Sequence, residues 1–118
     1  MKFKIEFVLV HLILHFEFIV CFKNANSYIK KDILCKSVAE NGVVLLTITS
    51  KKGETKKKKV AFLIARQHPG ETVSSFLMQG FIDFICSSAV EAQHLRNLYI
   101  FKIIPMVNPD GVIFGNFR

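Results

Sequence analysis

Apolar residues concentrate in short segments of the chain, and the spacing within each segment predicts an element of secondary structure. Residues 43–50 (VVLLTITS) and 60–66 (VAFLIAR) are of strand length and rich in aliphatic and β-branched side chains. Residues 72–86 (TVSSFLMQGFIDFIC) place apolar side chains at helical spacing, and residues 98–107 (LYIFKIIPMV) form a third predicted strand with a proline near its end. Because the segment 60–66 does not alternate between apolar and polar residues, we expect both of its faces to be covered.

The connections between these segments predict their arrangement. Residues 51–59 hold a glycine among lysines, which is typical of an exposed loop, so we expect 43–50 and 60–66 to form an antiparallel hairpin. A short helix is expected over 91–97 (EAQHLRN), and a short helix or irregular segment that ends in a turn is expected over 33–42 (ILCKSVAENG). A strand, a helix and a parallel strand form a βαβ unit with a right-handed crossover. The fold class is therefore α/β, with a mixed sheet in which an antiparallel hairpin precedes a βαβ unit.

The N-terminal segment is more apolar than the residues that follow it. Residues 7–22 (FVLVHLILHFEFIVCF) follow two lysines and precede KNANS, in the manner of a secretory signal over residues 1–27. Histidines and a glutamate interrupt the apolar run, which favours a buried helix instead, and the run is shorter than the roughly 20 residues of a membrane span. We divide the chain into an apolar segment, 1–24, and a domain, 25–118, and keep the secretory signal as the alternative.

Composition and charge narrow the class of protein. Hydrophobic residues make up 51% of the 118 residues, which is too apolar for a disordered chain. The formal net charge is +7, but the densest lysine runs lie in the predicted loop without aromatic residues to stack bases, so a nucleic acid partner is not expected. Cys21, Cys35 and Cys86 lack the spacing of a zinc knuckle or a redox pair, and their odd number favours reduced thiols in a cytosolic protein.

The turn between the strand 60–66 and the helix 72–86 carries the candidate chemistry. His68 and Glu71 are separated by Pro-Gly, and in a βαβ unit the loop that leaves a strand lies at the sheet edge where ligands bind. An imidazole nitrogen and a carboxylate oxygen are two of the three protein ligands that a catalytic zinc needs. The pair alone is equally compatible with a structural role, in which Glu71 is an acidic residue of the first helical turn and His68 is a loop residue.

Longer phrases around this turn resemble a known family. HPGET at 68–72, FKIIPMVNPDGV at 101–112 and GNFR at 115–118 are similar in wording and spacing to the metallocarboxypeptidases of family M14, and among them to the cytosolic carboxypeptidases. The likeness includes LCKSVAENGVVLLTIT at 34–49, so it covers about 33–118. It implies a carboxypeptidase-like mixed sheet, and the sub-branch most similar in wording is the group that shortens tubulin polyglutamate chains.

The resemblance implies roles for individual residues. His68 and Glu71 fall on the family's first two zinc ligands. Arg118 falls on the arginine that binds the scissile carbonyl of the substrate and stabilises the oxyanion, as a fixed guanidinium does. Asp110 is expected to be a turn-forming residue rather than an acid catalyst. Gln67 departs from the valine usual in this group, which changes the surroundings of the metal while the ligands stay in place.

Other parts of the family's site correspond to positions beyond Arg118: the third zinc ligand, an Asn-Arg pair for the substrate carboxylate and the general-base glutamate. His94 lies on a predicted helix away from the turn, and we expect it to be a surface histidine. The chain is therefore expected to be the N-terminal part of a zinc carboxypeptidase catalytic domain, truncated, with weak zinc binding and little activity by itself.

The function implied by the resemblance is removal of C-terminal or branch glutamates from proteins such as tubulin, by attack of zinc-activated water on the peptide carbonyl. The expected cofactor is Zn2+, and the expected partners are acidic, polyglutamylated protein tails. A membrane partner is not expected, and the expected location is the cytoplasm, with association to microtubules. The alternative is a catalytically inactive remnant or pseudoenzyme that binds acidic tails.

Overall fold

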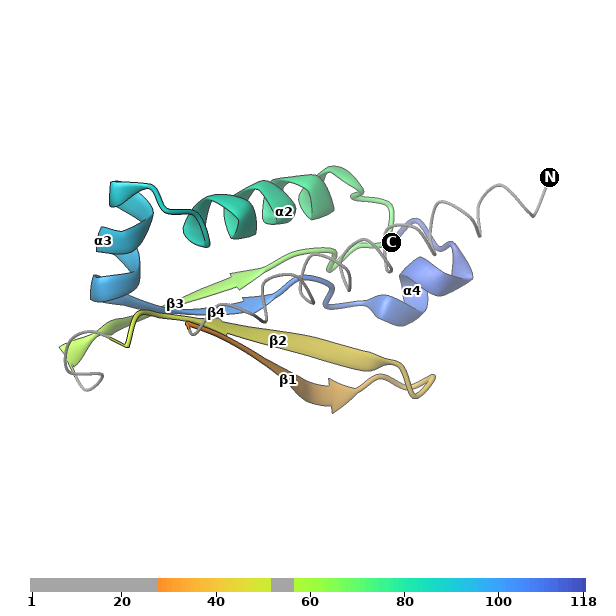
Figure 1. Cartoon of the computed structure of the whole chain (residues 1–118). Helices are drawn as coiled ribbons and strands as arrows, with labels where there is room; N and C mark the ends of the chain where they lie inside the picture. Colours follow the sequence, from red (N-terminus) through yellow and green to blue (C-terminus); the bar gives the residue numbers. More distant parts are fainter. Residues whose placement is uncertain (1–27, 52–56) are drawn as a thin grey trace.

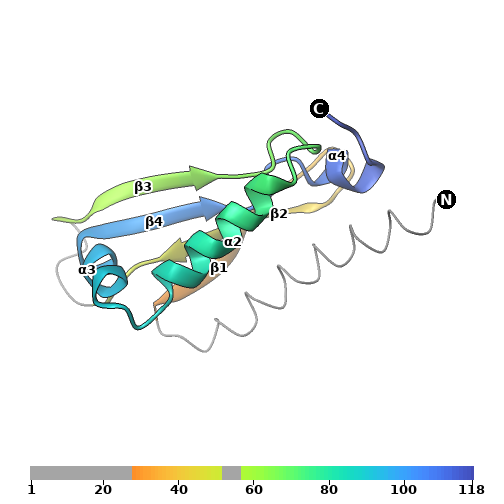
Figure 2. The same ribbon diagram turned by 90° about the horizontal axis from the view of Figure 1, so that it is seen from above.

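The computed structural model of the chain describes residues 28–51 and 57–118 (Figure 1). In chain order, the elements of these residues are β1 (Ile29–Lys36), β2 (Gly42–Ile48), β3 (Lys59–Ile64), α2 (Val73–Ile85), α3 (Val90–Leu98), β4 (Tyr99–Ile104) and α4 (Pro109–Phe114). The strands form one sheet in the order β1-β2-β4-β3. α2 lies across one face of this sheet, while α3 and α4 lie at its two ends (Figures 1 and 2).

The predicted combination of an antiparallel hairpin and a βαβ unit is confirmed, but the hairpin consists of other strands than expected. β1 pairs with β2 in antiparallel register from Ile29 opposite Ile48 to Lys36 opposite Gly42. The expected pairing of 43–50 with 60–66 is wrong, because β4 lies between β2 and β3 and hydrogen-bonds to both. The segment 33–42, expected to be helical or irregular, is the end of β1 and a turn.

β4 is the strand that organises the sheet. It pairs antiparallel with β2, with Leu46 opposite Ile103, and parallel with β3, with Leu63 also opposite Ile103. Three of its six residues, Phe101, Ile103 and Ile104, are buried, and Phe101 and Ile103 belong to the core cluster beneath α2. The parallel pair of β3 and β4 is joined through α2 and α3, so the predicted helices over 72–86 and 91–97 and the predicted strand over 98–107 are confirmed within two or three residues.

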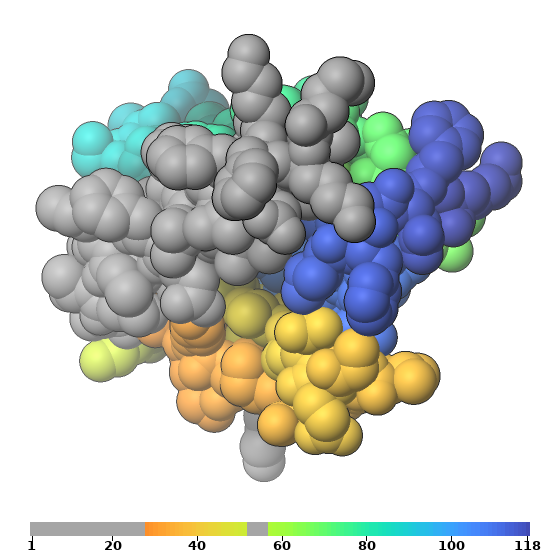
Figure 3. Space-filling view, turned by 90° about the vertical axis from the view of Figure 1, so that its right-hand side faces the viewer, coloured from red at the N-terminus to blue at the C-terminus, as the bar shows by residue number. Residues whose placement is uncertain are grey.

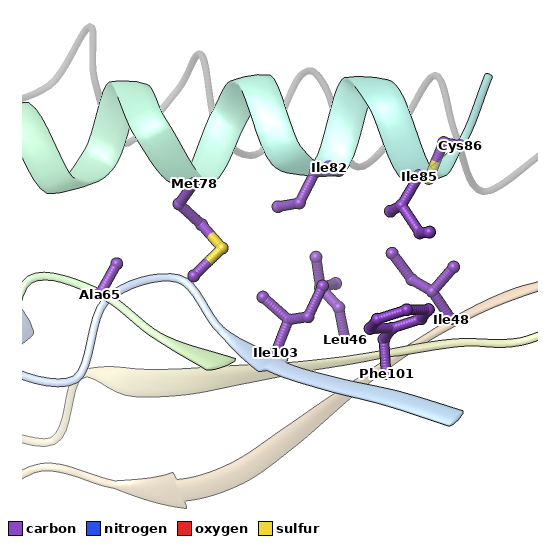
Figure 4. Packing of buried hydrophobic residues seen from close by; sticks show 9 residues of the cluster. All are labelled: Leu46, Ile48, Ala65, Met78, Ile82, Ile85, Cys86, Phe101 and Ile103. Atoms are coloured by element: carbon purple, nitrogen blue, oxygen red, sulfur yellow. The ribbon is translucent and has the colours of Figure 1, made fainter. Parts of the chain in front are cut away.

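The core lies between α2 and the sheet (Figure 4). Met78, Ile82 and Ile85 follow the helical spacing of the sequence and point at the sheet, where they meet Ile103 and other buried side chains. Those other members of the cluster are Leu46, Ile48, Ala65, Cys86 and Phe101. Full burial of an aliphatic side chain stabilises a fold by about 1.5–3 kcal/mol, so this cluster is the main source of stability for the described residues.

Only one face of β3 is buried in the described part of the chain. Ala61 and Leu63 pack against the core, while Val60, Phe62 and Ile64 are each more than half exposed. The expectation that both faces of 60–66 are covered is therefore wrong for the described residues. The reason is that α2 covers one face of the sheet, and none of the described elements covers the face of β3 that carries Val60, Phe62 and Ile64.

The NPDG sequence, predicted as a turn, begins the helix α4. The side chain of Asn108 is the N-cap and accepts a hydrogen bond of 2.9 Å from the backbone N–H of Gly111. Pro109 occupies the first helical turn, where its missing N–H costs nothing, and Gly115 ends the helix with a φ of 74°. Asn, Pro, Asp and Gly are common both in turns and at the start of helices, which explains why NPDG was incorrectly predicted as a turn.

Two further expectations concern membranes and the N-terminal segment. Within the described residues no single helix is long and apolar enough to span a membrane, and α2 and α3, which reach the required length and composition together, are bent by 93° at their junction. The division at residue 24 and the secretory alternative over 1–27 lie outside the described residues.

Candidate functional site

His68 and Glu71 lie on one tight turn between the end of β3 and the start of α2, as predicted. The backbone N–H of Glu71 donates to the carbonyl of His68 over 3.1 Å, and the N–H of Thr72 donates to the carbonyl of Gly70 over 2.9 Å. His68 is half-buried and Glu71 is exposed. Both side chains are therefore accessible to a ligand, and the backbone between them is fixed by local hydrogen bonds.

A buried residue, Arg66, fixes the turn by hydrogen bonds, although it was not among the predicted site residues. The Arg66 guanidinium is buried and donates to the carbonyl of Pro69 through Nε (3.1 Å) and Nη2 (2.8 Å), and to Ser75 Oγ through Nη1 (2.9 Å). Burial lowers the pKa of Arg66 from its usual range. The sequence offered little signal for this role, because Arg66 is simply the last residue of the predicted strand 60–66 and arginine is rarely fully buried.

The C-terminal segment closes over the same turn. The N–H of Gly70 donates to the carbonyl of Phe117 over 2.7 Å, so Arg118, the next residue, begins beside the turn. A Cβ on Gly70 would lie 2.6 Å from Phe117 Cδ2, which shows how closely the two segments approach. In Figure 3 the blue C-terminal segment and the green segment after β3 are neighbours at one end of the molecule.

α4 supports the turn from a third side. A Cβ on Gly111 would lie 2.3 Å from Cγ of Pro69, so the proline ring rests directly on the backbone of α4. Only glycine permits this approach. The turn that carries His68 and Glu71 is therefore fixed by Arg66, by α4 and by Phe117.

Asp110 connects α4 to the turn between β1 and β2 and is not the turn-forming residue that was expected. Its carboxylate accepts hydrogen bonds from Asn41 Nδ2 (2.8 Å), Ser37 Oγ (2.5 Å) and the N–H of Ala39 (3.0 Å). The Asn41 amide, followed by the Ser37 hydroxyl and the Ala39 N–H, holds the pKa of Asp110 below its usual value. Sequence spacing gave no sign of this contact, because the hairpin turn and α4 are about 70 residues apart.

Comparison with known proteins decides the family. The family model described as zinc carboxypeptidase matches residues 17–117. The chain belongs to the zinc carboxypeptidase family. The chain is 52% identical over 94 residues to cytosolic carboxypeptidase 2 of Xenopus tropicalis, and 47% identical over 95 residues to cytosolic carboxypeptidase 3 of Bos taurus. The matches cover 77% and 79% of the chain but 10% of each relative, so the chain spans about a tenth of the length of these relatives.

A solved structure supports the fold assignment of this family member. The metallo-carboxypeptidase from Burkholderia cenocepacia has a TM-score of 0.77 and 29% sequence identity, over 84% of this chain and 27% of that one. The predicted carboxypeptidase-like mixed sheet is thereby confirmed, and the described sheet is open rather than closed into a barrel.

The donor atoms of the turn are of the types that bind zinc, but they form only part of a zinc site. An imidazole nitrogen and a carboxylate oxygen are both zinc ligands in proteins, and His68 and Glu71 supply one of each from the same turn, three positions apart. Among residues 28–51 and 57–118 there is no group of three or more His, Cys, Asp or Glu residues that could hold a metal ion. A complete catalytic site requires at least one further protein donor.

The other sequence-predicted residues lie at the two ends of the sheet. Arg118 is exposed and next in sequence to the residue that bonds the turn. Gln67 is exposed within the turn itself. His94 is exposed on α3, at the end of the sheet opposite α4, so its prediction as a surface histidine is confirmed.

Proposed function

We propose that this chain supplies two zinc ligands, His68 and Glu71, and a carbonyl-binding arginine, Arg118, to a metallocarboxypeptidase. The observation that carries the proposal is the hydrogen bond from Gly70 to Phe117, which brings the ligand turn and the segment of the arginine together. Membership in the zinc carboxypeptidase family supports Zn2+ as the cofactor.

Each residue has a distinct task in this proposal. The His68 nitrogen and the Glu71 carboxylate would hold the zinc ion, which when bound lowers the pKa of a water molecule and polarises a carbonyl. The Arg118 guanidinium donates hydrogen bonds to the oxygen of the scissile carbonyl. Negative charge grows on that oxygen as the peptide bond is attacked, so the guanidinium binds the transition state more tightly than the substrate.

The proposed substrates are acidic protein tails, with release of C-terminal or branch glutamates from proteins such as tubulin. The support is the similarity to cytosolic carboxypeptidases 2 and 3, at 47–52% identity. Their name also supports a cytoplasmic location, and a tubulin substrate entails association with microtubules. The chain spans about a tenth of the length of these relatives, so the substrates are proposed for the whole protein.

The test joins the chain to the segment that follows the matched region in cytosolic carboxypeptidase 2 of Mus musculus, which is 51% identical over 96 residues. The fusion is expected to bind zinc and to release glutamate from a polyglutamylated peptide. His68→Ala and Glu71→Gln are expected to abolish both properties. Arg118→Ala is expected to lower kcat by about 100-fold while zinc stays bound, as for other lost oxyanion donors.

His94→Ala is the matched control, because this histidine is exposed on α3 and far from the turn. It is expected to leave zinc content and turnover unchanged. Zinc content that survives His68→Ala, or that is lost in His94→Ala, would refute the ligand assignment. Binding of polyglutamylated peptide by the fusion without any glutamate release would favour a non-catalytic binding protein instead.

A further inference from the structure

Arg66 combines burial, charge and an unfavourable backbone conformation. It is 2% exposed, and its φ of 53° lies in the left-handed region that side chains other than glycine rarely adopt. Within residues 28–51 and 57–118, all hydrogen-bond partners of its guanidinium are neutral oxygens. Burying a guanidinium without a carboxylate partner costs free energy of desolvation. The hydrogen bonds of Arg66 must therefore offset this cost.

Those hydrogen bonds all converge on the ligand turn and the helix behind it. Nε and Nη2 donate to the same carbonyl, that of Pro69, between His68 and Glu71. The backbone N–H of Arg66 donates to Ser74 Oγ over 3.2 Å, and this hydroxyl in turn donates to the carbonyl of Glu71 over 2.7 Å. Arg66 thus fixes one carbonyl of the turn directly and a second through Ser74.

The peptide group between Pro69 and Gly70 is held from both sides. A trans peptide is planar, and its C=O and N–H point in opposite directions. Here the C=O accepts from Arg66, and the N–H donates to the carbonyl of Phe117. The orientation of this one plane therefore sets the directions of His68 and Glu71 on either side of it, and also the place where the segment bearing Arg118 docks.

We propose that Arg66 is a positioning residue of the metal site, which orients the Pro69–Gly70 peptide and thereby aligns the two ligands with Arg118. This inference rests on the proposed function and assigns a role to a residue that does not itself contact metal or substrate. The competing explanation is that Arg66 only stabilises the fold, as a second buried arginine, Arg96, does.

Arg96 is a matched control because it is also buried and also donates to backbone carbonyls. Its Nη1 donates to the carbonyls of Ile85 and Ser87, and its guanidinium lies 4.4 Å from the centre of the Tyr28 ring. These contacts lie at the C-terminal end of α2, whereas Arg66 binds Ser75 at the N-terminal end. Loss of Arg96 should weaken the fold without reorienting the ligand turn.

The experiment uses the 118-residue chain and the variant Arg66→Gly. Glycine tolerates the positive φ, so this change relieves the backbone conformation while it removes the donors. NMR hydrogen exchange of the Gly70 amide, normalised to a core amide such as that of Ile103, reports the turn. Titration with zinc chloride, followed through the His68 ring signals, reports the metal site. Glu40→Gly controls for the glycine effect, because Glu40 also has a positive φ, 63°, in the exposed turn before β2.

Arg66→Gly is expected to raise the normalised exchange rate of the Gly70 amide by about 10-fold, the scale of a lost hydrogen bond to a charged group. It is also expected to weaken zinc binding by about 10-fold, as for other residues that orient metal ligands. Arg66→Lys, which retains one donor group, is expected to fall between Arg66→Gly and the unchanged chain. Arg96→Met and Glu40→Gly are expected to leave both quantities unchanged. Should Arg66→Gly not fold, Arg66→Lys provides the same two readings.

Two results would overturn the positioning role. In the first, Arg66→Gly has the same normalised exchange and zinc affinity as Arg96→Met. In the second, Arg66→Lys is indistinguishable from the unchanged chain. Failure of the proposed function looks different. In that case the His68 signals of the unchanged chain do not respond to zinc chloride, while the exchange rate of the Gly70 amide still decides whether Arg66 orients the turn.

Discussion

The glycines Gly111 and Gly80 allow one substitution to be compared in two helical environments. Both lie in helices, Gly111 in α4 and Gly80 in α2. A Cβ on Gly80 would meet nothing within 4 Å, whereas a Cβ on Gly111 would lie 2.3 Å from Pro69 Cγ and 2.9 Å from Asn108 Nδ2. Alanine should therefore stabilise one helix and displace the ligand turn from the other.

The expected magnitudes follow from these contacts. Alanine in place of a helical glycine stabilises by about 1 kcal/mol through helix propensity, and Gly80→Ala should show this gain in full. In Gly111→Ala the same gain is opposed by overpacking against a rigid proline ring, which costs about 1–3 kcal/mol, and by damage to the Asn108 cap, which costs about 1 kcal/mol. Gly111→Ala should thus be destabilised by about 1–3 kcal/mol in net terms.

Thermal unfolding followed by circular dichroism measures both variants. About 1 kcal/mol shifts the midpoint of a domain of this size by roughly 4–8 °C, so Gly80→Ala should gain about 5 °C and Gly111→Ala should lose about 10 °C. Gly111→Ala should also weaken zinc binding in the fusion, because Pro69 lies between the two ligands. Equal stability of the two variants, or wild-type zinc affinity in a destabilised Gly111→Ala, would refute the claim that α4 supports the turn.

Three further predictions test the core, the open face of β3 and the hairpin contact. Ile103→Ala, at a fully buried position, should cost about 2–5 kcal/mol in urea unfolding. Phe62→Thr, on the exposed face of β3, should change stability by less than about 0.5 kcal/mol in the same assay, and a larger loss would show that this face is covered. Asp110 has a lowered pKa in the folded state, so its contribution is present above the unfolded value of about 4 and is lost as the pH falls below it. Asp110→Asn should therefore be less stable than the unchanged chain at pH 7, and the difference should shrink as the pH falls below about 4; a difference independent of pH would contradict the role of the carboxylate charge.

The helices and the ligand turn were predictable because their signals are local. Met78, Ile82 and Ile85 repeat at helical spacing. Pro-Gly between an apolar strand and an apolar helix predicts a turn, whichever strands the first strand pairs with. The pairing of strands was not predictable in the same way. Residues 43–50 and 60–66 are neighbours in sequence and separated by a loop with turn-forming residues, but nothing in either segment records that β4 inserts between them.

The site was predicted in part, for a related reason. His68 and Glu71 are chemically conspicuous, whereas Arg66 and Asp110 act through contacts with groups that sequence spacing does not identify. Arg66 is the charged last residue of the predicted strand 60–66, and only its burial and its two bonds to Pro69 reveal its task. Asp110 looks like part of a turn, and only the distant Asn41 and Ser37 side chains show that it joins two segments.

The topology explains why these segments meet. β3 and β4 are parallel, so the turn after β3 and the segment 105–118 after β4 leave the sheet at the same end. β2 is antiparallel to β4 and begins at this end, which brings the preceding turn, 37–41, to it as well. α4 lies between the two turns. It is hydrogen-bonded to the hairpin turn through Asp110, and the Pro69 ring of the ligand turn packs against its Gly111. α4 also leads directly into the segment that bonds Gly70, so the hairpin turn and the ligand turn both contact this helix and the residues that follow it.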